Sequence, residues 1–487
     1  MKHARVTTSH IRAVTGTTFV STLSWLLGGY YTAQIAGVVD ALNHNFITPR
    51  GLPATAANLL LGFTVCSALA GTIIGALIAR RAAELLGRKR SMIIAAMLFL
   101  VSAFGSAFPE MALSSGTAGS GALWLFIIFR FLGGVGMGLA SLVAPMHVSE
   151  FAPSALRGQL GAYQQIAIGG GIVIALFVSW GIGLQGDDSW MLESGWRYIM
   201  VSLAVPALAM LWLSFAVPES PSWLVKRGRI EDARRELSRS ADPEEIRTIL
   251  EDLAQGTRNE PPAVGLMSFG ARVVLVGIAL NVLQQLIGLT AISYYGPQIL
   301  QRMGYHMDSA MLGVLVARSL NFLATMVVVL IVDRVGRKPL LIVGALVMGV
   351  SMMVIGVLFQ VGGSATLGLV AVCCYLTGLG ISFGPIVWIM LSEMYPAPIR
   401  AQATSISVKA QWGANFLVAG SFPVLFGSSA LNTTMHGGFA FWIYGGFAVL
   451  AALVVLRFVP ETKGIDSERL DAFWRRQAVD APEPVRA

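Results

Sequence analysis

The chain has 487 residues, of which 55% are apolar and only 12% are charged, and its mean hydropathy is +0.69. Soluble globular domains carry about 25% charged residues, so the chain has too few polar side chains to cover a water-soluble body of this size. The composition excludes a soluble enzyme, a disordered chain and a secreted disulfide scaffold as readings of the whole chain, and it predicts a polytopic membrane protein. Three cysteines, Cys66, Cys373 and Cys374, lie in apolar runs, which indicates buried thiols rather than disulfides or metal ligands.

Twelve apolar segments follow one another along the chain, each about as long as a membrane-spanning helix. They cover residues 14–39, 55–79, 91–108, 121–145, 159–183, 196–217, 270–298, 309–332, 340–360, 367–391, 401–426 and 437–458. The first is too long for a signal peptide and has no cleavage site, so we interpret it as a span. Residues 219–265 are densely charged, which predicts a soluble helical connector. The expected organisation is an N-terminal six-helix half (1–218), the connector (219–265), a C-terminal six-helix half (266–459) and a tail (460–487).

The net charge of +8 is distributed unevenly over the predicted loops. Lys and Arg gather in alternate loops, in the connector and in both termini, whereas the opposite loops carry little beyond Arg50 and Arg302. The basic side of a membrane protein is the cytoplasmic side, so both termini are expected in the cytoplasm of a multi-pass cell-membrane protein. The charge therefore indicates topology, and nucleic acid is excluded as a partner.

Short motifs repeat about half a chain length apart. Ser149-Glu150-x-x-Pro153-x-x-x-Arg157 recurs as Ser392-Glu393-x-x-Pro396-x-x-x-Arg400, Gly87-Arg88-Lys89 as Gly336-Arg337-Lys338, and Pro218-Glu219-Ser220 as Pro460-Glu461-Thr462. Each pair falls at the same span of its half. Two parallel six-helix halves are typical of transporters that rock around a site near the bilayer midplane.

Acidic and basic side chains of these motifs fall at predicted cytoplasmic helix ends. The set comprises Glu84, Arg88, Glu150, Arg157, Glu219, Asp333, Arg334, Arg337, Glu393, Arg400 and Glu461. Exposed ion pairs contribute only about 0–1 kcal/mol each, so such a network can form in one state and part in another. We predict a cytoplasmic gate; the alternative is that these charges only mark the membrane boundary.

Uncharged polar residues inside the spans predict a binding site. Six amides come from four helices: Gln165, Gln284, Gln285, Asn321, Gln411 and Asn415. Amides both donate and accept, which suits the hydroxyls of a neutral sugar, and Trp388 and Trp412 can lie against its C–H face. The alternative is that these amides only form hydrogen bonds between helices.

No Asp, Glu or His lies deep in a predicted span, but Arg130, Arg318 and Lys409 do. A proton carrier needs a group that titrates between two states, so the usual carriers are missing. Three interpretations of the buried cations stay open. They pair locally with carbonyls and water, they attract an anionic ligand such as a sugar acid, or Lys409 carries the proton itself.

Four motifs together resemble the sugar porters of the major facilitator superfamily. They are Pro218-Glu219-Ser220-Pro221-x-Trp223-Leu224, Asp333-Arg334-x-Gly336-Arg337-Lys338, Gln284-Gln285-x-x-Gly288 and Gln411-Trp412. The resemblance implies an all-α membrane fold of twelve helices in two six-helix repeats. It also implies that Gln165, Gln284, Gln285, Asn321, Trp388, Gln411 and Trp412 contact sugar, and that Tyr294 and Tyr295 close over it from outside.

Three departures from the family pattern affect function. Thr290 stands where relatives usually carry Asn, so one contact to a sugar hydroxyl is altered. Proton-coupled relatives carry Asp at the position of Tyr31 and Glu at that of Leu203, while their partner Arg is retained as Arg130. A transporter without these carboxylates is expected to be a uniporter.

The sequence therefore predicts a monosaccharide transporter for a pentose or hexose that works by alternating access, without a cofactor and as a monomer. The alternatives are a symporter with a non-standard proton site, a sugar-acid transporter that uses Arg318 and Lys409, and a non-transporting sugar sensor.

Overall fold

The structure is a computed structural model that describes residues 8–112, 118–151, 157–238, 246–251, 265–464 and 474. Its long helices in the first half of the chain are α1 (Thr8–Ala33), α3 (Ala54–Leu86), α4 (Arg88–Ala107), α5 (Ala118–Phe151), α6 (Arg157–Gly183), α8 (Trp196–Ser202) and α9 (Ala204–Ala216). Those in the second half are α13 (Ala271–Leu286), α14 (Leu289–Arg302), α15 (Met307–Val335), α16 (Arg337–Val361), α17 (Ala365–Ile381), α18 (Ile386–Met394), α19 (Arg400–Gly427), α20 (Ser429–Met435) and α21 (Phe439–Phe458). The prediction of an all-α membrane fold is confirmed.

Ten of the described helices, or pairs of consecutive helices, are long and apolar enough to cross a membrane. They coincide with ten of the twelve predicted spans. The two other predicted spans correspond to α1, of 26 residues, and α19, of 28 residues. Both helices are long enough to cross a membrane, but they are more polar than the other ten. In α19 the polarity includes Lys409, Gln411 and Asn415, residues that the sequence singles out. The structure therefore contains a helix at each predicted span.

The charged connector begins with two short helices, α10 (Pro221–Lys226) and α11 (Ile230–Leu237). Their apolar sides meet residues 246–250 in a small core of Trp223, Leu224, Ala233, Leu237, Ile246 and Leu250. Ser220 begins α10 as its N-cap, since its side chain accepts a hydrogen bond from the Trp223 N–H. The described part of the connector is helical, as predicted.

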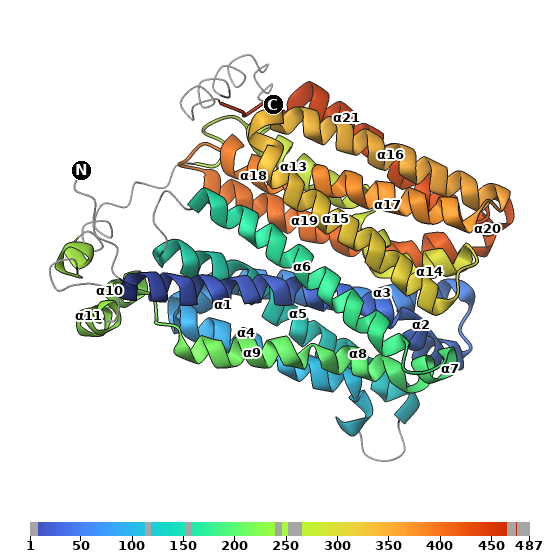
Figure 1. The fold of residues 1–487 in the computed structure, drawn as a ribbon, viewed down its shortest axis with the longest axis horizontal. Helices are drawn as coiled ribbons and strands as arrows, with labels where there is room; N and C mark the ends of the chain where they lie inside the picture. The colour runs from blue at the N-terminus through green and yellow to red at the C-terminus, as the bar shows by residue number, and fades with distance from the viewer. Residues whose placement is uncertain are drawn as a thin grey trace, which may run out of the picture. The chain divides into compact units, whose positions relative to one another are not determined.

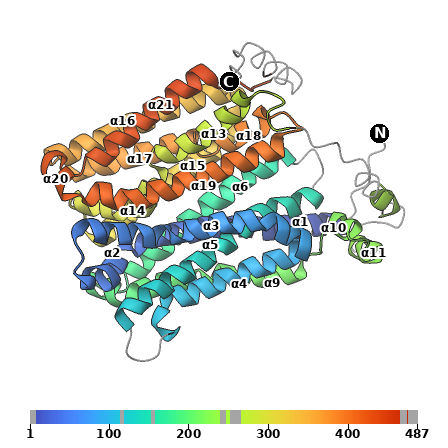
Figure 2. The same cartoon turned by 180° about the vertical axis from the view of Figure 1, so that it is seen from behind.

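The chain divides into two compact units. Unit 1 contains Met1–Thr32, Ser67–Ile172 and Arg197–Pro262, and unit 2 contains Ala33–Cys66, Val173–Trp196 and Ala263–Ala487. Within unit 1, α4 packs against α5 and α9; within unit 2, α16 packs against α17 and α21, and α13 against α19 (Figures 1 and 2). Unit 2 therefore includes the second half of the chain together with short segments of the first.

Glycines bring the helices of unit 1 into backbone contact. A Cβ atom on Gly71 of α3 would lie 2.0 Å from the Phe131 carbonyl oxygen of α5, and one on Gly134 would lie 2.0 Å from the Ala68 carbonyl oxygen. Small residues permit this close approach, which is the usual packing of helices in membranes. No larger side chain fits between α3 and α5 at these positions.

Candidate functional site

The seventh predicted span is broken in its middle. Gly288 adopts φ 91°, a left-handed conformation that favours glycine, and separates α13 from α14. The break leaves carbonyl groups without helical partners, and Tyr375 of α17 satisfies one of them by donating to the Ile287 oxygen at 3.0 Å. The Gly of the Gln284-Gln285-x-x-Gly288 motif is therefore required by the backbone.

The tenth span is broken as well, between α17 and α18. Pro385 lies at this break, where it cannot donate a backbone hydrogen bond. The Phe383 carbonyl oxygen accepts a hydrogen bond from Gln284 Nε2 at 2.5 Å. Gln284 therefore joins the two discontinuous helices, and in membrane transporters such breaks surround the binding site.

Around these breaks, unit 2 assembles most of the predicted amides. Gln411 Nε2 of α19 donates to Gln284 Oε1 of α13 at 2.6 Å. The hydroxyl of Thr290 on α14 lies 3.1 Å from Gln285 Oε1 and 2.8 Å from Asn415 Oδ1, so it can donate to either oxygen. Three helices thus bring their polar side chains together.

One acceptor in this cluster has no partner among the described residues. Gln411 is buried, and its Oε1 makes no hydrogen bond there. Asn321 of α15 donates to the Leu376 carbonyl oxygen at 2.7 Å, while Trp388 and Trp412 are half-buried. A buried amide oxygen costs about 1–3 kcal/mol when it is unpaired, so this atom favours a ligand that donates, such as a sugar hydroxyl.

The two tyrosines predicted to close over a ligand are buried on α14. The Tyr295 hydroxyl donates to the Ala419 carbonyl oxygen at 3.0 Å, and its ring lies 5.1 Å from that of Phe422. Tyr294 is buried beside it. Tyr295 therefore attaches α14 to α19 in the structure.

Gln165 is the one predicted sugar contact in unit 1, where it is half-buried on α6. Sequence reasoning missed Gln34, which lies in η1 (Gln34–Gly37), a short helix of unit 2 that packs against α14. Gln34 is buried, and its Oε1 has no partner among the described residues. Gln34 falls near the end of the first predicted span. Hydropathy does not locate span ends closely, so the sequence did not indicate that Gln34 is a buried polar residue.

The predicted coupling position in unit 1 contains no carboxylate. The Arg130 guanidinium lies 4.1 Å from the centre of the Tyr31 ring, and the Tyr31 hydroxyl donates to the Arg130 carbonyl oxygen. Arg130 is 1% exposed, and its Nε and Nη1 have no hydrogen-bond partner among the described residues. Leu203 is buried between α8 and α9. The side chains around this Arg are an aromatic ring and hydroxyl groups.

The two cations of the second half differ in their surroundings. Arg318 is buried on α15 and donates to the Ser293 hydroxyl of α14, a partner that the sequence did not indicate. Lys409 is exposed on α19. Only Arg318 therefore lies within the packed interior of unit 2.

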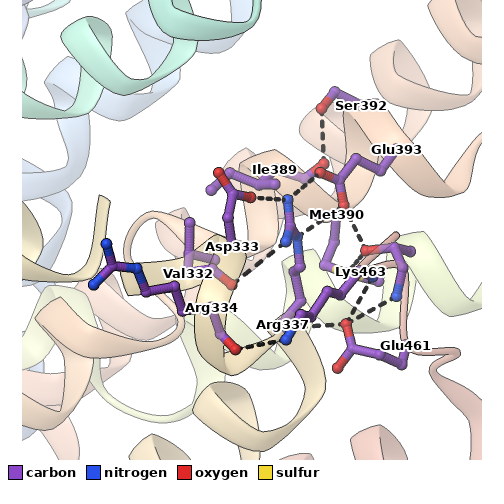
Figure 3. Close-up of polar contacts among 11 residues, drawn as sticks. Val332, Asp333, Arg334, Arg337, Ile389, Met390, Ser392, Glu393, Glu461 and Lys463 are labelled. Carbon is purple, nitrogen blue, oxygen red and sulfur yellow. Dashed lines mark hydrogen bonds and ion pairs between the residues drawn. The ribbon is translucent and has the colours of Figure 1, made fainter. Parts of the chain in front are cut away.

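A cluster of charges at one end of unit 2 gathers three of the repeated motifs (Figure 3). Arg337 Nη2 pairs with Glu393 Oε1 at 2.7 Å and with Asp333 Oδ1 at 2.8 Å. Glu461 accepts backbone N–H groups of Arg337 and Lys338 at 3.0 Å. Burial alone would raise the pKa of Glu461, but four backbone N–H donors outweigh it and hold that pKa below the ordinary value.

Unit 1 contains the equivalent cluster. Arg88 Nη2 pairs with Glu150 Oε1 at 2.7 Å, and Glu219 accepts the backbone N–H groups of Arg88 and Lys89 at 2.8 and 3.2 Å. Gly87 and Gly336 precede the two helices with φ 92° and 101°, and a Cβ atom on either would collide with the Glu carboxylate. Each glycine thus admits a carboxylate to a helix N-terminus, where it is favoured. Burial raises the pKa of Glu150, although Arg88 opposes this.

Other members of the predicted charge network lie outside these clusters. Glu84 pairs with Arg80 at 2.9 Å instead of Arg88. The Arg334 side chain is exposed and turned away from the cluster in Figure 3. Arg400 donates to the Tyr395 carbonyl oxygen at 3.1 Å, and the side chain of Arg157 lies outside what the structure describes. The described ion pairs of the two clusters each join residues of one unit.

Two repeated charge clusters, and two discontinuous helices with buried amides beside the breaks, are typical of a secondary membrane transporter. The family model for "Sugar (and other) transporter" matches residues 17–474. The chain is 39% identical to the D-xylose-proton symporter of Escherichia coli (strain K12) over 468 residues, which cover 94% of this chain and 95% of that protein. It is 37% identical to the glucose facilitated diffusion protein of Zymomonas mobilis over 466 residues, 95% of this chain and 98% of that one.

The fold has matches among solved structures. The inward open conformation of the xylose transporter XylE from E. coli matches with a TM-score of 0.83 and 37% identity, over 95% of this chain and 100% of that one. A structure of XylE bound to 6-bromo-6-deoxy-D-glucose matches with a TM-score of 0.77 and 38% identity, over 96% and 100%. The chain therefore belongs to the sugar transporter family, whose members are transporters and not enzymes.

Proposed function

We propose that this protein is a facilitative transporter, a uniporter, of a neutral monosaccharide, working by alternating access. The single observation that carries the proposal is the amide cluster at the two helix breaks, where Gln411 offers an unpaired buried oxygen beside Gln284. Relatives that are similar to this chain include a D-xylose-proton symporter and a glucose facilitated diffusion protein. Pentose and hexose differ by one hydroxymethyl group, so the substrate class is a pentose or hexose.

The amides are suited to a sugar because each offers both a donor and an acceptor. Gln411 donates to Gln284, while the Gln411 oxygen has no partner among the described residues. A sugar hydroxyl can replace that bond by donating to one amide and accepting from the other. We propose that Gln165, Gln285, Thr290, Asn321, Trp388, Trp412 and Asn415 complete the site, and that Tyr294 and Tyr295 close it.

Uniport is supported by the coupling position. Tyr31 is buried, and its hydroxyl already donates to the Arg130 backbone. Tyrosine in water titrates near pH 10 and arginine above 12, so neither exchanges protons at physiological pH. Leu203 offers no titratable group at all. Lys409, the other candidate carrier, is exposed on α19.

A second candidate function is transport of a sugar acid. Arg318 favours it, because a buried guanidinium on the helix that carries Asn321 could attract a carboxylate. We rank it second because the Arg318 guanidinium already donates to Ser293.

For topology, we propose that the ends of the bundle that carry the two charge clusters face the cytoplasm, together with both termini. The positive-inside rule supports this orientation, since the connector and both clusters are rich in Lys and Arg. Residues 39–50 and the start of α15 then face the outside.

Counterflow and accumulation in proteoliposomes test the proposal. The protein is expected to exchange labelled pentose or hexose against internal unlabelled sugar, and to equilibrate sugar without accumulating it when the exterior is acidic. Accumulation above the external concentration that a protonophore abolishes would show a symporter. Exchange of uronic acids in preference to neutral sugars would favour the second candidate, and absence of any exchange would leave only a sensor.

A further inference from the structure

Asp40 is a carboxylate that the transport mechanism does not use. It lies in α2 (Val39–Leu42), a four-residue helix in the loop between α1 and α3. Two cavities of unit 2, of about 520 and 400 Å³, share Asp40, Asn43 and Gln301 in their walls. Figure 1 shows α2 and α7 (Asp188–Trp190) at the end of unit 2 opposite α18, which carries Glu393. Asp40 is thus at the end that we propose faces the outside.

The partners of this carboxylate are neutral. Gln301 Nε2 of α14 donates to Asp40 Oδ2 at 2.9 Å, and Gln298, one turn earlier on α14, lies beside the same carboxyl. Gln298 Oε1 has no hydrogen-bond partner among the described residues. Gln298 Nε2 has no partner there either, so this amide can donate to the ionised carboxylate of Asp40 or accept from the protonated one.

The charged groups nearby are directed elsewhere or lie across a cavity. Arg302 of α14 donates to the Phe426 carbonyl oxygen at 2.7 Å, and its guanidinium lies 4.1 Å from the centre of the Phe426 ring. Asp188 lines the larger cavity with two histidines, His44 and His306, and with Tyr305. Glu193 lies in η6 (Met191–Gly195), which also packs against α2. The structure describes no ion pair for Asp40.

The contact between Asp40 and Gln301 joins the first half of the chain to the second. A second contact between the halves of the chain is the close packing of Asn58 of α3 against Gly427 of α19. A Cβ atom added to Gly427 would lie only 2.4 Å from Asn58 Nδ2. Both contacts lie within unit 2, and each crosses from the first half of the chain to the second, so a movement of one half against the other at this end breaks them. Asp40 then becomes hydrated, so it passes between two environments in every cycle.

We propose that Asp40 is an external proton-binding site whose neutral form holds α2 against α14, so that external acid slows sugar entry without driving it. Burial, which Gln301 and Gln298 only partly offset, raises the pKa of Asp40 when the contact is closed. Hydration returns it toward its ordinary value near 4 when the contact opens. Because the closed state binds the proton more tightly, acid stabilises the closed state. The proton enters and leaves on the same side, so no gradient is coupled to sugar.

The test rests on the proposed function and compares Asp40→Asn with Asp188→Asn, the other carboxylate of the larger cavity. Sugar counterflow is measured in proteoliposomes with equal pH on both sides, between pH 7.5 and 4.5. Wild-type counterflow is expected to fall by at least about threefold on acidification. Asp40→Asn, which imitates the neutral form, is expected to be slow and independent of pH, and Asp188→Asn to keep the wild-type profile. An unchanged profile in Asp40→Asn, or a flat one in the wild type, overturns the proposal.

A second measurement needs no transport, so it separates this inference from the proposed function. Val39→Cys, at a side chain that is 2% exposed in the wall of the smaller cavity, is introduced into protein lacking Cys66, Cys373 and Cys374, and it is labelled with a membrane-impermeant maleimide. At each pH the labelling rate of the cysteine variant that retains Asp40 is divided by the rate of the same variant with Asp40→Asn. The effect of pH on the ionisation of the thiol is the same in both proteins and cancels in this ratio. The ratio is expected to fall toward one on acidification, as Asp40 becomes neutral. A ratio that does not change with pH overturns the proposal even where counterflow is absent at every pH.

Discussion

The two halves of the chain repeat their charge clusters but not their membrane interiors. Arg88, Glu150 and Glu219 in the first half have the contacts of Arg337, Glu393 and Glu461 in the second. The described amide cluster, in contrast, belongs to unit 2, and the predicted coupling position in unit 1 contains Arg130 against Tyr31. We propose that the parts that differ between the halves determine which sugar the protein carries and how transport is driven.

The clusters themselves also differ. Arg337 has a second acidic partner in Asp333, whereas the residue at the same distance before Arg88, Glu84, pairs with Arg80. Glu393 also accepts a hydrogen bond from the Thr462 hydroxyl. Ser220, at the position that matches Thr462, lies beside Glu150 in the same way, so the clusters differ in that Arg88 has one acidic partner and Arg337 has two.

The largest expected effect is that of Arg88→Gln. It leaves the Glu150 side chain, 16% exposed, without its cation, which is expected to destabilise the protein by about 3 kcal/mol. Arg337→Gln is expected to cost less, about 2 kcal/mol, because Glu393 is more exposed at 31% and water screens its charge. Thermal unfolding of the purified variants measures both. Equal losses, or a larger loss for Arg337→Gln, would contradict the comparison.

Next in size are the amides. Gln284→Ala and Gln411→Ala are each expected to weaken sugar binding by about 1–3 kcal/mol, since each removes a hydrogen-bonding group in a dry site. Gln165→Ala, on the half-buried first-half residue, is expected to cost less. Equilibrium binding of labelled sugar measures the three affinities. If Gln284→Ala and Gln411→Ala both bind as the wild type does, these amides only join helices.

Tyr31→Asp sharpens the comparison at the coupling position. It places a carboxylate beside the Arg130 guanidinium, so we expect sugar transport to become dependent on pH. Full coupling is not expected while Leu203 is apolar. The measurement is sugar uptake with an acidic exterior, with and without a protonophore. Protonophore-sensitive accumulation in this single variant would show that one carboxylate is sufficient.

The smallest expected effects are slopes of stability against pH. Glu150 has a pKa raised by burial, so its contribution to stability falls as pH rises through the window above its ordinary value of 4.5. Glu461 has a lowered pKa, so its contribution is present above 4.5 and is lost as pH falls below that value. Glu150→Gln is therefore expected to flatten the pH profile of the unfolding temperature above 4.5, and Glu461→Gln to flatten it below. Profiles that stay parallel to the wild type would contradict both signs.

The sequence predicted what depends on composition and repetition. The twelve spans and the connector follow from hydropathy and charge, and the repeated motifs identified Arg88, Glu150, Arg337 and Glu393 before their contacts were known. It did not predict the partners that depend on helix register. Ser293 beneath Arg318, Tyr375 at the Gly288 break and Gln34 beside α14 are ordinary residues in apolar runs, and only the packing of neighbouring helices gives them a role.

The contact of α3 with α5 through Gly71 and Gly134 has a mechanical consequence. Side chains between two helices can change rotamer, which lets the helices slide past one another. Helices in backbone contact, such as α3 and α5, have no side chains between them that could rearrange in this way. We therefore expect this pair of helices to transmit force without deforming. Unit 2 also has helices in backbone contact, such as α3 and α19 at Gly62 and Gly420, so bending there is expected at Gly288 and at the α17–α18 break beside the amides.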